Sequence, residues 1–164
     1  IGTDGGNGIG TRTDNLEILD ANGDIVCTRV SSQAGWTMRG DWYVYDLTLD
    51  DATGAGRFVT NGFRLFVFGT LTIDANYIIS HNGSGASQST PGEGAAEGTL
   101  KGGSDGGAGG EGGASPGQGG SGGDGGGAGG NGGIVFISAR NIVNNGTIQA
   151  QGGNGAAGGD GGTE

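Results

Sequence analysis

Between Gly102 and Gly133 the chain repeats two glycines followed by one other residue, and this period of three constrains its fold more than any other feature. Nine non-glycine residues carry the period: Asp105, Ala108, Glu111, Ala114, Gln118, Ser121, Asp124, Ala128 and Asn131. The phase is held within short runs and shifts at Ser115-Pro116 and again at Gly127. A flexible glycine-rich linker has no reason to hold such a phase, so the pattern favours an ordered element over a disordered one.

Three residues per turn is the period of a left-handed extended helix of the polyproline II type, which makes no hydrogen bonds within itself. With two glycines per turn, two of its three faces carry no side chain, so neighbouring helices can approach and exchange N–H···O=C bonds. The sequence therefore predicts a polyglycine II bundle of three short rods, with turns at or near Ser115-Pro116 and Gly127. Collagen is excluded, because it needs one glycine in three and many prolines, and this chain has 2 Pro.

The nine non-glycine positions are expected to point outward from the rods, and the glycines to face the neighbouring rods. A Gly→Val change at Gly107 or Gly123 is then expected to disrupt rod packing. The alternative is that the segment is a disordered linker, with no rod packing for either change to disrupt.

Composition and charge narrow the function classes. The chain has 164 residues, 45 Gly and only 32% hydrophobic residues, so a conventional core must come chiefly from residues 41–80 and 134–150. A formal charge of -10 argues against nucleic acid as a partner. No apolar stretch has the length of a membrane span, so we expect no membrane partner. Cys27 is the single cysteine, which rules out an intrachain disulfide.

An internal repeat flanks the glycine block. At an offset of 69 residues, Leu65 matches Ile134, Val67 matches Phe136, Ile73 matches Ile142, and Ile79 matches Ile148. The sequence predicts that six of the residues in the two copies share one buried core on neighbouring strands: Leu65, Val67, Ile73, Phe136, Ile142 and Ile148. A weaker third copy precedes them, since Leu47–Asp50 echoes Leu71–Asp74 and Thr60–Gly62 echoes His81–Gly83.

Short β-branched runs that recur in similar order and end at Asn-Gly or Gly-Thr are typical of a β-solenoid, in which each rung buries its apolar face by stacking. The predicted fold is therefore all-β: β-solenoid-like stacked strand rungs with an inserted polyglycine II helix bundle and no significant α-helix. We expect residues 1–40 to form an N-terminal strand or attachment region. Residues 41–164 form the β-rung domain, with polyglycine II excursions at 83–133 and 152–162.

The N-terminal region offers two further predictions. Leu16–Asp20 followed by Asn22–Val26 resembles a hairpin around an Asn-Gly turn. Aromatic residues gather just after it, and we interpret them as core or interface anchors rather than as a carbohydrate-stacking site: Trp36, Trp42, Tyr43 and Tyr45.

The candidate catalytic residues are few. His81 is the only histidine, and a turn-capping or surface role is favoured over catalysis, which needs an orienting acid and a nucleophile in space. Cys27 lies in an apolar run and is interpreted as a small buried hydrophobe. Dinucleotide-type glycine patterns arise here by chance, without strand–helix context. Asp105 and Asp124 lack the following apolar residue of a calcium-binding nonapeptide. We therefore expect no enzyme activity, no catalytic residue, no cofactor and no specific metal site; a cation held by carbonyls and scattered carboxylates stays open.

The runs Asp41–Leu49, Asn61–Ile73 and Ile134–Ile148, with the glycine block between the last two, resemble a family of glycine-rich proteins encoded by tailed bacteriophages and some bacteria. They are similar, more loosely, to phage tail-fibre adhesins that carry a polyglycine II sandwich at the fibre tip. The resemblance covers roughly residues 41–164. The chain differs from those adhesins in lacking an obvious helical attachment segment and aromatic-rich loops between the glycine rods.

The resemblance implies a structural protein on the virion surface, as a tail-fibre, receptor-binding or capsid-exterior component. Its expected partners are further copies of itself, with a trimer favoured, other virion proteins and a host cell-surface receptor. Two alternatives stay open. One is an ice-binding (antifreeze) protein, since polyglycine II bundles also serve there, and the other is a bacterial surface adhesin.

Overall fold

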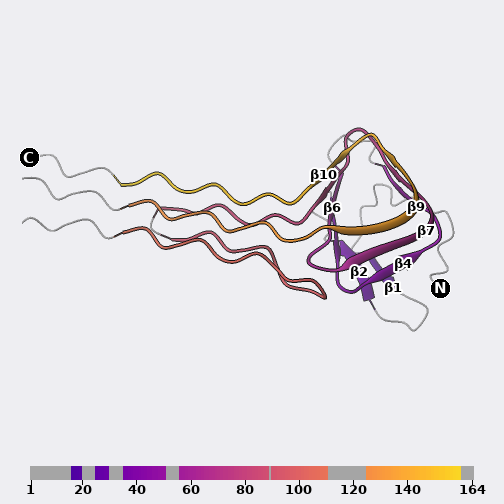
Figure 1. Cartoon of the computed structure of the whole chain (residues 1–164), viewed down its shortest axis with the longest axis horizontal. Coiled ribbons are helices and arrows are strands. Elements are labelled where there is room, and N and C mark those ends of the chain that lie inside the picture. The colour runs from indigo at the N-terminus through magenta and orange to yellow at the C-terminus, as the bar shows by residue number, and fades with distance from the viewer. Residues whose placement is uncertain are drawn as a thin grey trace, which may run out of the picture. The chain divides into compact units, whose positions relative to one another are not determined.

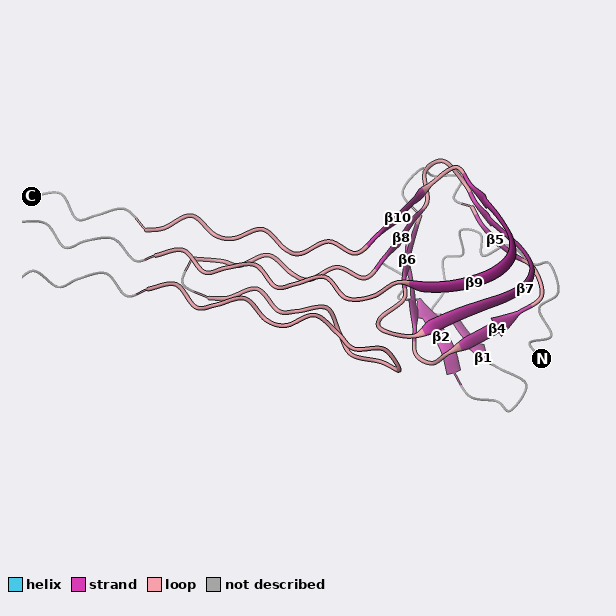
Figure 2. Ribbon diagram, in the orientation of Figure 1, coloured by secondary structure: helices cyan, strands magenta, loops and turns pink. Residues whose placement is uncertain are grey.

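A computed structural model of the chain describes residues 16–19, 25–29, 35–50, 56–88, 90–110 and 125–159. The described residues contain strands and extended segments and no helix, and hence no helix of the length and apolarity needed to cross a membrane (Figure 2). The fold is mostly β, as the sequence predicts. The strands are β1 (Leu16–Leu19), β2 (Ile25–Arg29), β3 (Gly35–Met38), β4 (Trp42–Val44), β5 (Leu47–Leu49), β6 (Arg57–Val59), β7 (Arg64–Ile73), β8 (Ile78–Ser80), β9 (Phe136–Asn144) and β10 (Thr147–Gln149).

The strands form two sheets. One has six strands in the order β1-β2-β3-β6-β8-β10, in which β1, β2 and β3 are antiparallel neighbours and the later pairs are parallel. In the other sheet β7 is the central strand, parallel to β4 and β5 on one side and to β9 on the other. From β3 onward the chain passes back and forth between the two sheets, with β4 and β5 following each other in the same sheet. Parallel strands that are neighbours in space are therefore separated by a visit to the other sheet (Figure 1). The antiparallel β1–β2 pair confirms the predicted hairpin, whose turn lies outside the described residues.

The chain divides into two compact units. The first comprises residues 1–81, 97–101 and 134–149, and holds all ten strands. The second comprises residues 82–96, 102–133 and 150–164. The expected excursion over 83–133 is thus interrupted at 97–101, where the Leu100 N–H donates to the Gly62 carbonyl within the first unit. The expected boundary at residue 40 has no counterpart between these units, because β3 pairs with β6.

The second unit consists of extended segments that lie side by side, which we call tracts. Their described residues are tract A (82–88), tract B (90–96), tract C (102–110), tract D (125–133) and tract E (150–159).

Register in the parallel pairs follows the weaker repeat residue by residue. Leu47 pairs with Leu71 and Leu49 with Ile73, as the echo between the two segments predicts. The match of Thr60 with His81 is also confirmed, because β6 and β8 pair in that register and the Thr60 N–H donates to the Ser80 carbonyl at 3.0 Å. The repeat therefore reflects stacking of equivalent strands.

The stronger repeat is only partly in register. Ile79 pairs with Ile148 as predicted. Val67 pairs with Ala139, three residues beyond the predicted Phe136, and Ile73 pairs with Asn144, two residues beyond the predicted Ile142. Two features explain the drift: β7 contains an irregularity between Val67 and Thr70, and four residues link β7 to β8 whereas two link β9 to β10.

The irregularity in β7 centres on Gly69. A Cβ at Gly69 would lie 2.8 Å from the Tyr45 carbonyl oxygen and still closer to the Asp46 carboxylate. The Gly69 N–H donates to that Tyr45 carbonyl, and the Thr70 N–H donates to Asp46 Oδ1, both at 2.6 Å. Only glycine allows this approach, so Gly69 fixes the point where β7 bends around the core.

The core fills the space between the two sheets. Alternating residues of β7 are fully or almost fully buried, and Trp42 stacks near Phe58 with ring centroids 6.2 Å apart. Of the predicted core, Leu65, Val67 and Ile73 are confirmed as buried. Phe136, Ile142 and Ile148 are not: they are 40%, 49% and 39% exposed. The register drift places Phe136 beside Arg64 on the outer face, and in the part of the chain that the structure describes no further strand lies beyond β9 and β10 to cover Ile142 and Ile148.

Candidate functional site

His81 lies in the core of the first unit, only 2% exposed, so the expected turn-capping or surface role is wrong. Its backbone N–H donates to the Gln149 carbonyl at 3.1 Å, and its ring Nδ1 lies 3.1 Å from the Ile134 carbonyl oxygen. Both contacts join the histidine to the segment that re-enters the first unit after the glycine block. The geometry gives His81 a structural role.

Cys27 is completely buried, as predicted, and burial raises the pKa of its thiol far above the usual value. A protonated, inaccessible thiol is a poor nucleophile and a poor metal ligand. Among the described residues no three histidine, cysteine, aspartate or glutamate side chains lie close enough together to hold a metal ion.

An ion pair between Asp41 and Arg64 is the main polar cluster of the first unit, and sequence analysis did not identify it. The Arg64 side chain donates to Asp41 Oδ2, and the Arg64 backbone N–H donates to Asp41 Oδ1 at 2.9 Å. The Thr99 hydroxyl donates to Asp41 Oδ1 as well. Desolvation by burial acts to raise the pKa of Asp41, but the hydrogen bonds from Arg64 and Thr99 outweigh it and hold that pKa below its usual value. The cluster fixes residues 97–101 to the start of β7.

Aromatic rings form a row on the outer face of the sheet built around β7. Tyr43 and Phe66 are stacked, with centroids 4.7 Å apart and planes 3° apart, and Phe136 follows at 5.6 Å from Phe66. Arg64 lies over the Phe66 ring at 5.7 Å. Of the four aromatics expected to be anchors, Trp36 and Trp42 are buried, whereas Tyr43 and Tyr45 are exposed. Because Tyr43 and Phe66 stack on each other, those faces are not available to stack on a sugar.

In the second unit, tract D is hydrogen-bonded to tract C with a strict period of three. The N–H groups of Gly125, Ala128 and Asn131 donate to carbonyls of tract C at 2.8–2.9 Å. The acceptors are Gly110, Gly107 and Ser104 in turn, so the two tracts are antiparallel. The period read from the sequence is therefore the period of the hydrogen bonds.

Tract D also bonds to the three other tracts. The carbonyls of Ala128 and Asn131 accept from the Gly92 and Ala95 N–H groups of tract B, both at 2.9 Å. Gly127 and Gly130 donate to carbonyls of tract A and accept from N–H groups of tract E. Successive residues of tract D thus serve different neighbours, and the tract is held on four sides.

Gly127 is an internal residue of tract D, so the predicted turn there is wrong. Hydrogen bonds to tract C continue across it from Gly125 to Ala128 without a break in period. Gly125 occupies the position equivalent to Ala128 and Asn131 and is itself exposed. Within 125–133 the hydrogen bonds keep a single phase, so there is no turn at Gly127. The other predicted turn, Ser115-Pro116, lies outside the described residues.

Adjacent glycines in tract C have different environments. A Cβ on Gly106 would overlap the Ala128 carbonyl group, with its carbon 2.6 Å away, whereas a Cβ on Gly107 would meet no atom within 4 Å. The expectation that Gly107 faces a neighbouring rod is therefore wrong. Gly123 lies outside the described residues.

Four of the nine predicted outward positions are described, and all four are exposed: Asp105, Ala108, Ala128 and Asn131. Two of them make side-chain contacts between tracts. Asp105 Oδ1 accepts from the Gly94 N–H at 2.7 Å, and Asn131 Nδ2 donates to Ser104 Oγ at 2.6 Å. The remaining five lie outside the described residues: Glu111, Ala114, Gln118, Ser121 and Asp124.

The excursion predicted over 83–133 includes tracts A and B, but the sequence predicted individual rods only within 102–133, because tracts A and B have no regular glycine period. The available signal was the spacing of isolated glycines. Gly83, Gly92 and Gly94 each lie where a Cβ would overlap backbone of another tract.

A comparison with protein-family models, curated proteins and solved structures finds no match for this chain.

Proposed function

We propose that the first unit is a short β-solenoid. Three observations support this: the chain returns repeatedly from one sheet to the other after β3, the pairs that stack are parallel, and Leu47–Leu49 and Arg57–Val59 pair in register with later strands. The antiparallel β1–β2 extension serves as the cover of its first rung.

We propose further that the tracts are polyglycine II rods. Their hydrogen bonds run between tracts, and those from tract D to tract C recur at every third residue. Among the described glycines only Gly62 has a positive φ, so the glycines of the tracts meet the requirement of polyproline II for a negative φ.

On this basis we propose that the protein is a structural component of the surface of a tailed bacteriophage virion, in a tail fibre or on the capsid exterior. The observation that carries the proposal is the hydrogen-bonded tract bundle, which would make the glycine-rich second unit a load-resisting element instead of a linker. A bundle with few side chains offers little for a protease to recognise and suits an exposed particle surface. Its partners would be other copies of the chain, other virion proteins and a host surface receptor; it would have no enzymatic activity and no cofactor.

Mass spectrometry of particles purified from the source organism tests this proposal. The chain should co-purify with intact particles at a fixed ratio to the major capsid protein, and antibodies against it should label the particle surface in electron micrographs. The ratio should survive a high-salt wash that removes adsorbed cell proteins. Absence from washed particles would contradict the proposal.

Ice binding is the second candidate, and the exposed alanines of three tracts favour it: Ala108 in tract C, Ala128 in tract D and Ala157 in tract E. Asp105 and Glu93 are exposed on the same bundle, and charged side chains interrupt a flat ice-binding face. Thermal hysteresis of the purified protein, together with its absence from particles, would establish this candidate. The same structural observations would support a bacterial surface adhesin. The neighbouring genes distinguish the two proposals: capsid and tail genes beside this one support the virion protein, and their absence supports the adhesin.

A further inference from the structure

The first unit has one end at which both sheets stop. Among the described strands, β9 pairs with β7 alone and β10 pairs with β8 alone. No described strand pairs with the outer edge of β9, whose backbone N–H and C=O groups run along a strand of 9 residues. Long exposed edges of this kind are sites of strand pairing unless charges, proline or a covering segment protect them.

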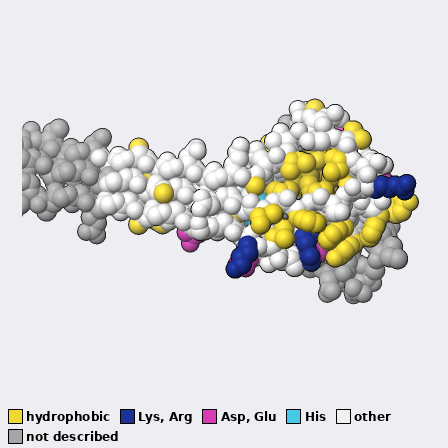
Figure 3. Space-filling model, viewed as in Figure 1, with side chains coloured by type: hydrophobic (Ala, Val, Ile, Leu, Met, Phe, Trp, Pro, Cys, Tyr) yellow, Lys and Arg dark blue, Asp and Glu magenta, His cyan; other side chains and the backbone are white. Residues whose placement is uncertain are grey.

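Apolar side chains at this end continue the core but lack a layer above them. Leu71 and Ile79 are 0% exposed, whereas their register partners Ile142 and Ile148 are 49% and 39% exposed. Val143 is 47% exposed on the same strand. Figure 3 shows apolar side chains gathered on both sides of the course of β9. We call β9, β10 and these exposed side chains the end face.

The opposite end of the stack is covered. Trp42 and Leu49, which lie on the strands that flank β7 on its other side, are 3% and 0% exposed. The six-stranded sheet also continues past β3 into β2 and β1. Inward-facing side chains are thus buried on the first strands of the stack and exposed on the last.

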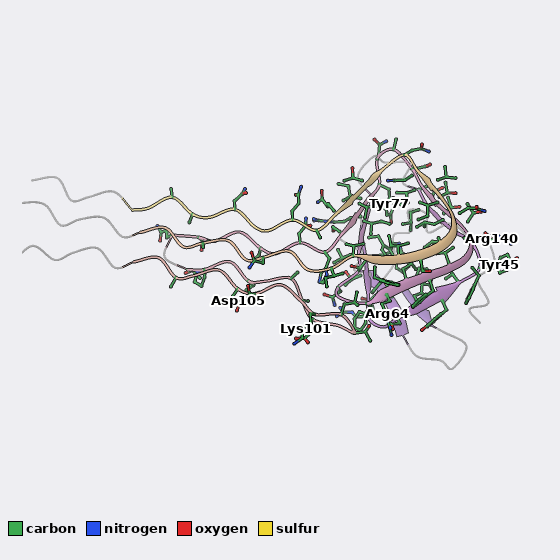
Figure 4. All side chains as sticks on the ribbon, in the orientation of Figure 1. Tyr45, Arg64, Tyr77, Lys101, Asp105 and Arg140 are labelled. Atoms are coloured by element: carbon green, nitrogen blue, oxygen red, sulfur yellow. The ribbon has the colours of Figure 1, made fainter. Side chains whose placement is uncertain are left out.

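Charge distinguishes the end face from the rest of the chain. The chain carries 17 Asp and Glu residues and a net charge of -10, yet residues 134–159 contain no carboxylate side chain. Their only charged side chain is Arg140, which points away from the unit (Figure 4). Two copies of an acidic protein repel each other at most surfaces, and a face without carboxylates avoids that repulsion.

We propose that the end face binds the same face of a second copy of the chain. A contact between identical surfaces is two-fold symmetric, so the β9 edges meet antiparallel and can extend the sheet across the interface. Because the other end of the stack is covered, stacking stops at two copies and gives a closed dimer, not a filament. This inference rests on the end face alone and does not depend on the virion proposal.

Sedimentation equilibrium of the full chain tests the inference. The wild type should sediment with twice the mass of one chain. The double substitution Ile142→Asp/Ile148→Asp places two carboxylates in the contact, and we expect it to raise the dimer Kd by ~100-fold or more. Phe68→Asp is the matched control: Phe68 is 60% exposed but lies on the central strand β7, both edges of which are already paired within the chain, so its dimer Kd should be unchanged.

Three results would overturn the inference: a wild type that stays monomeric at all concentrations, a trimer that the end-face variant leaves intact, or equal effects of the end-face and Phe68 variants. If the aspartate variant loses its β-sheet circular dichroism, Ile142→Thr/Ile148→Thr keeps the β-branched shape and takes its place. Hydrogen exchange of the wild type gives a readout without substitution. The β9 amides should exchange more slowly as the protein concentration rises, and concentration-independent exchange there would also contradict the dimer.

Discussion

Gly106 and Gly107 are neighbours in tract C, and the structure predicts opposite effects for the same substitution at the two positions. A methyl group at Gly106 would lie 2.6 Å from the Ala128 carbonyl carbon and 2.8 Å from the Gly129 oxygen, so tracts C and D must separate. A methyl group at Gly107 meets no atom within 4 Å. The two variants carry the same Gly→Ala change, and they differ in whether the added methyl group overlaps a neighbouring tract.

The magnitude follows from the hydrogen bonds that separation would break. The Gly106 N–H donates to the Gly92 carbonyl at 2.8 Å, and Ala128 and Asn131 donate to tract C at 2.9 Å. At about 0.5–1.5 kcal/mol for each bond, loss of these three gives roughly 1.5–4.5 kcal/mol of local destabilisation for Gly106→Ala. Gly107→Ala should be neutral or stabilise by about 0.4–1 kcal/mol, because alanine lowers the entropy of the unfolded chain.

Urea titration followed by the ¹H–¹⁵N amide resonances of tract D measures the local free energy of unfolding in each variant. The wild type and both variants are compared at the same pH and temperature, with the amides of β7 as an internal reference. Equal loss of stability in the two variants, or no loss in either, would refute the reasoning about tract contacts.

Three further outcomes are expected. Phe58→Ala should lower the free energy of unfolding by about 3–5 kcal/mol because the ring is fully buried, whereas Phe136→Ala, at a 40% exposed ring, should cost about 1 kcal/mol; denaturant titration with tryptophan fluorescence compares them. Because the pKa of Asp41 is lowered in the folded state, its contribution is present above the unfolded pKa of about 3.9 and is lost as the pH falls through the folded value. The difference in urea midpoint between the wild type and Asp41→Asn should therefore become smaller as the pH falls below the unfolded pKa. Cys27 should not react with a thiol reagent at neutral pH until denaturant is added, and a rapid reaction of the native protein would contradict its burial.

Sequence alone predicted the features that depend on periodicity. The echo of Leu47–Leu49 in Leu71–Ile73 gave the register of a parallel pair, because stacked strands of similar length repeat the same alternation. The glycine period likewise gave the hydrogen-bond period between tracts C and D, because every third residue of tract D donates to tract C.

The failures have a common physical cause, since they depend on what lies next to a strand or tract. Alternation placed Ile142 on the inward side of β9, but no pattern within β9 indicates whether another layer covers it. A one-residue bulge at Gly69 and unequal loops moved the register of Phe136 to the outer face. Asp41 contacts both Arg64 and Thr99. Thr99 lies 58 positions from Asp41 in the chain, and no local sequence pattern marks the contact.

Hydrogen exchange of the wild-type chain, read amide by amide by NMR, tests the central claim most directly: that the glycine tracts form an ordered, mutually hydrogen-bonded bundle. The account predicts that the Ala128, Gly130 and Asn131 amides, which donate to tracts A and C, exchange far more slowly than amides of an unstructured glycine-rich peptide. Exchange of these amides at the rate of the unstructured peptide, while β7 stays protected, would show that the tracts are a linker and would contradict the account.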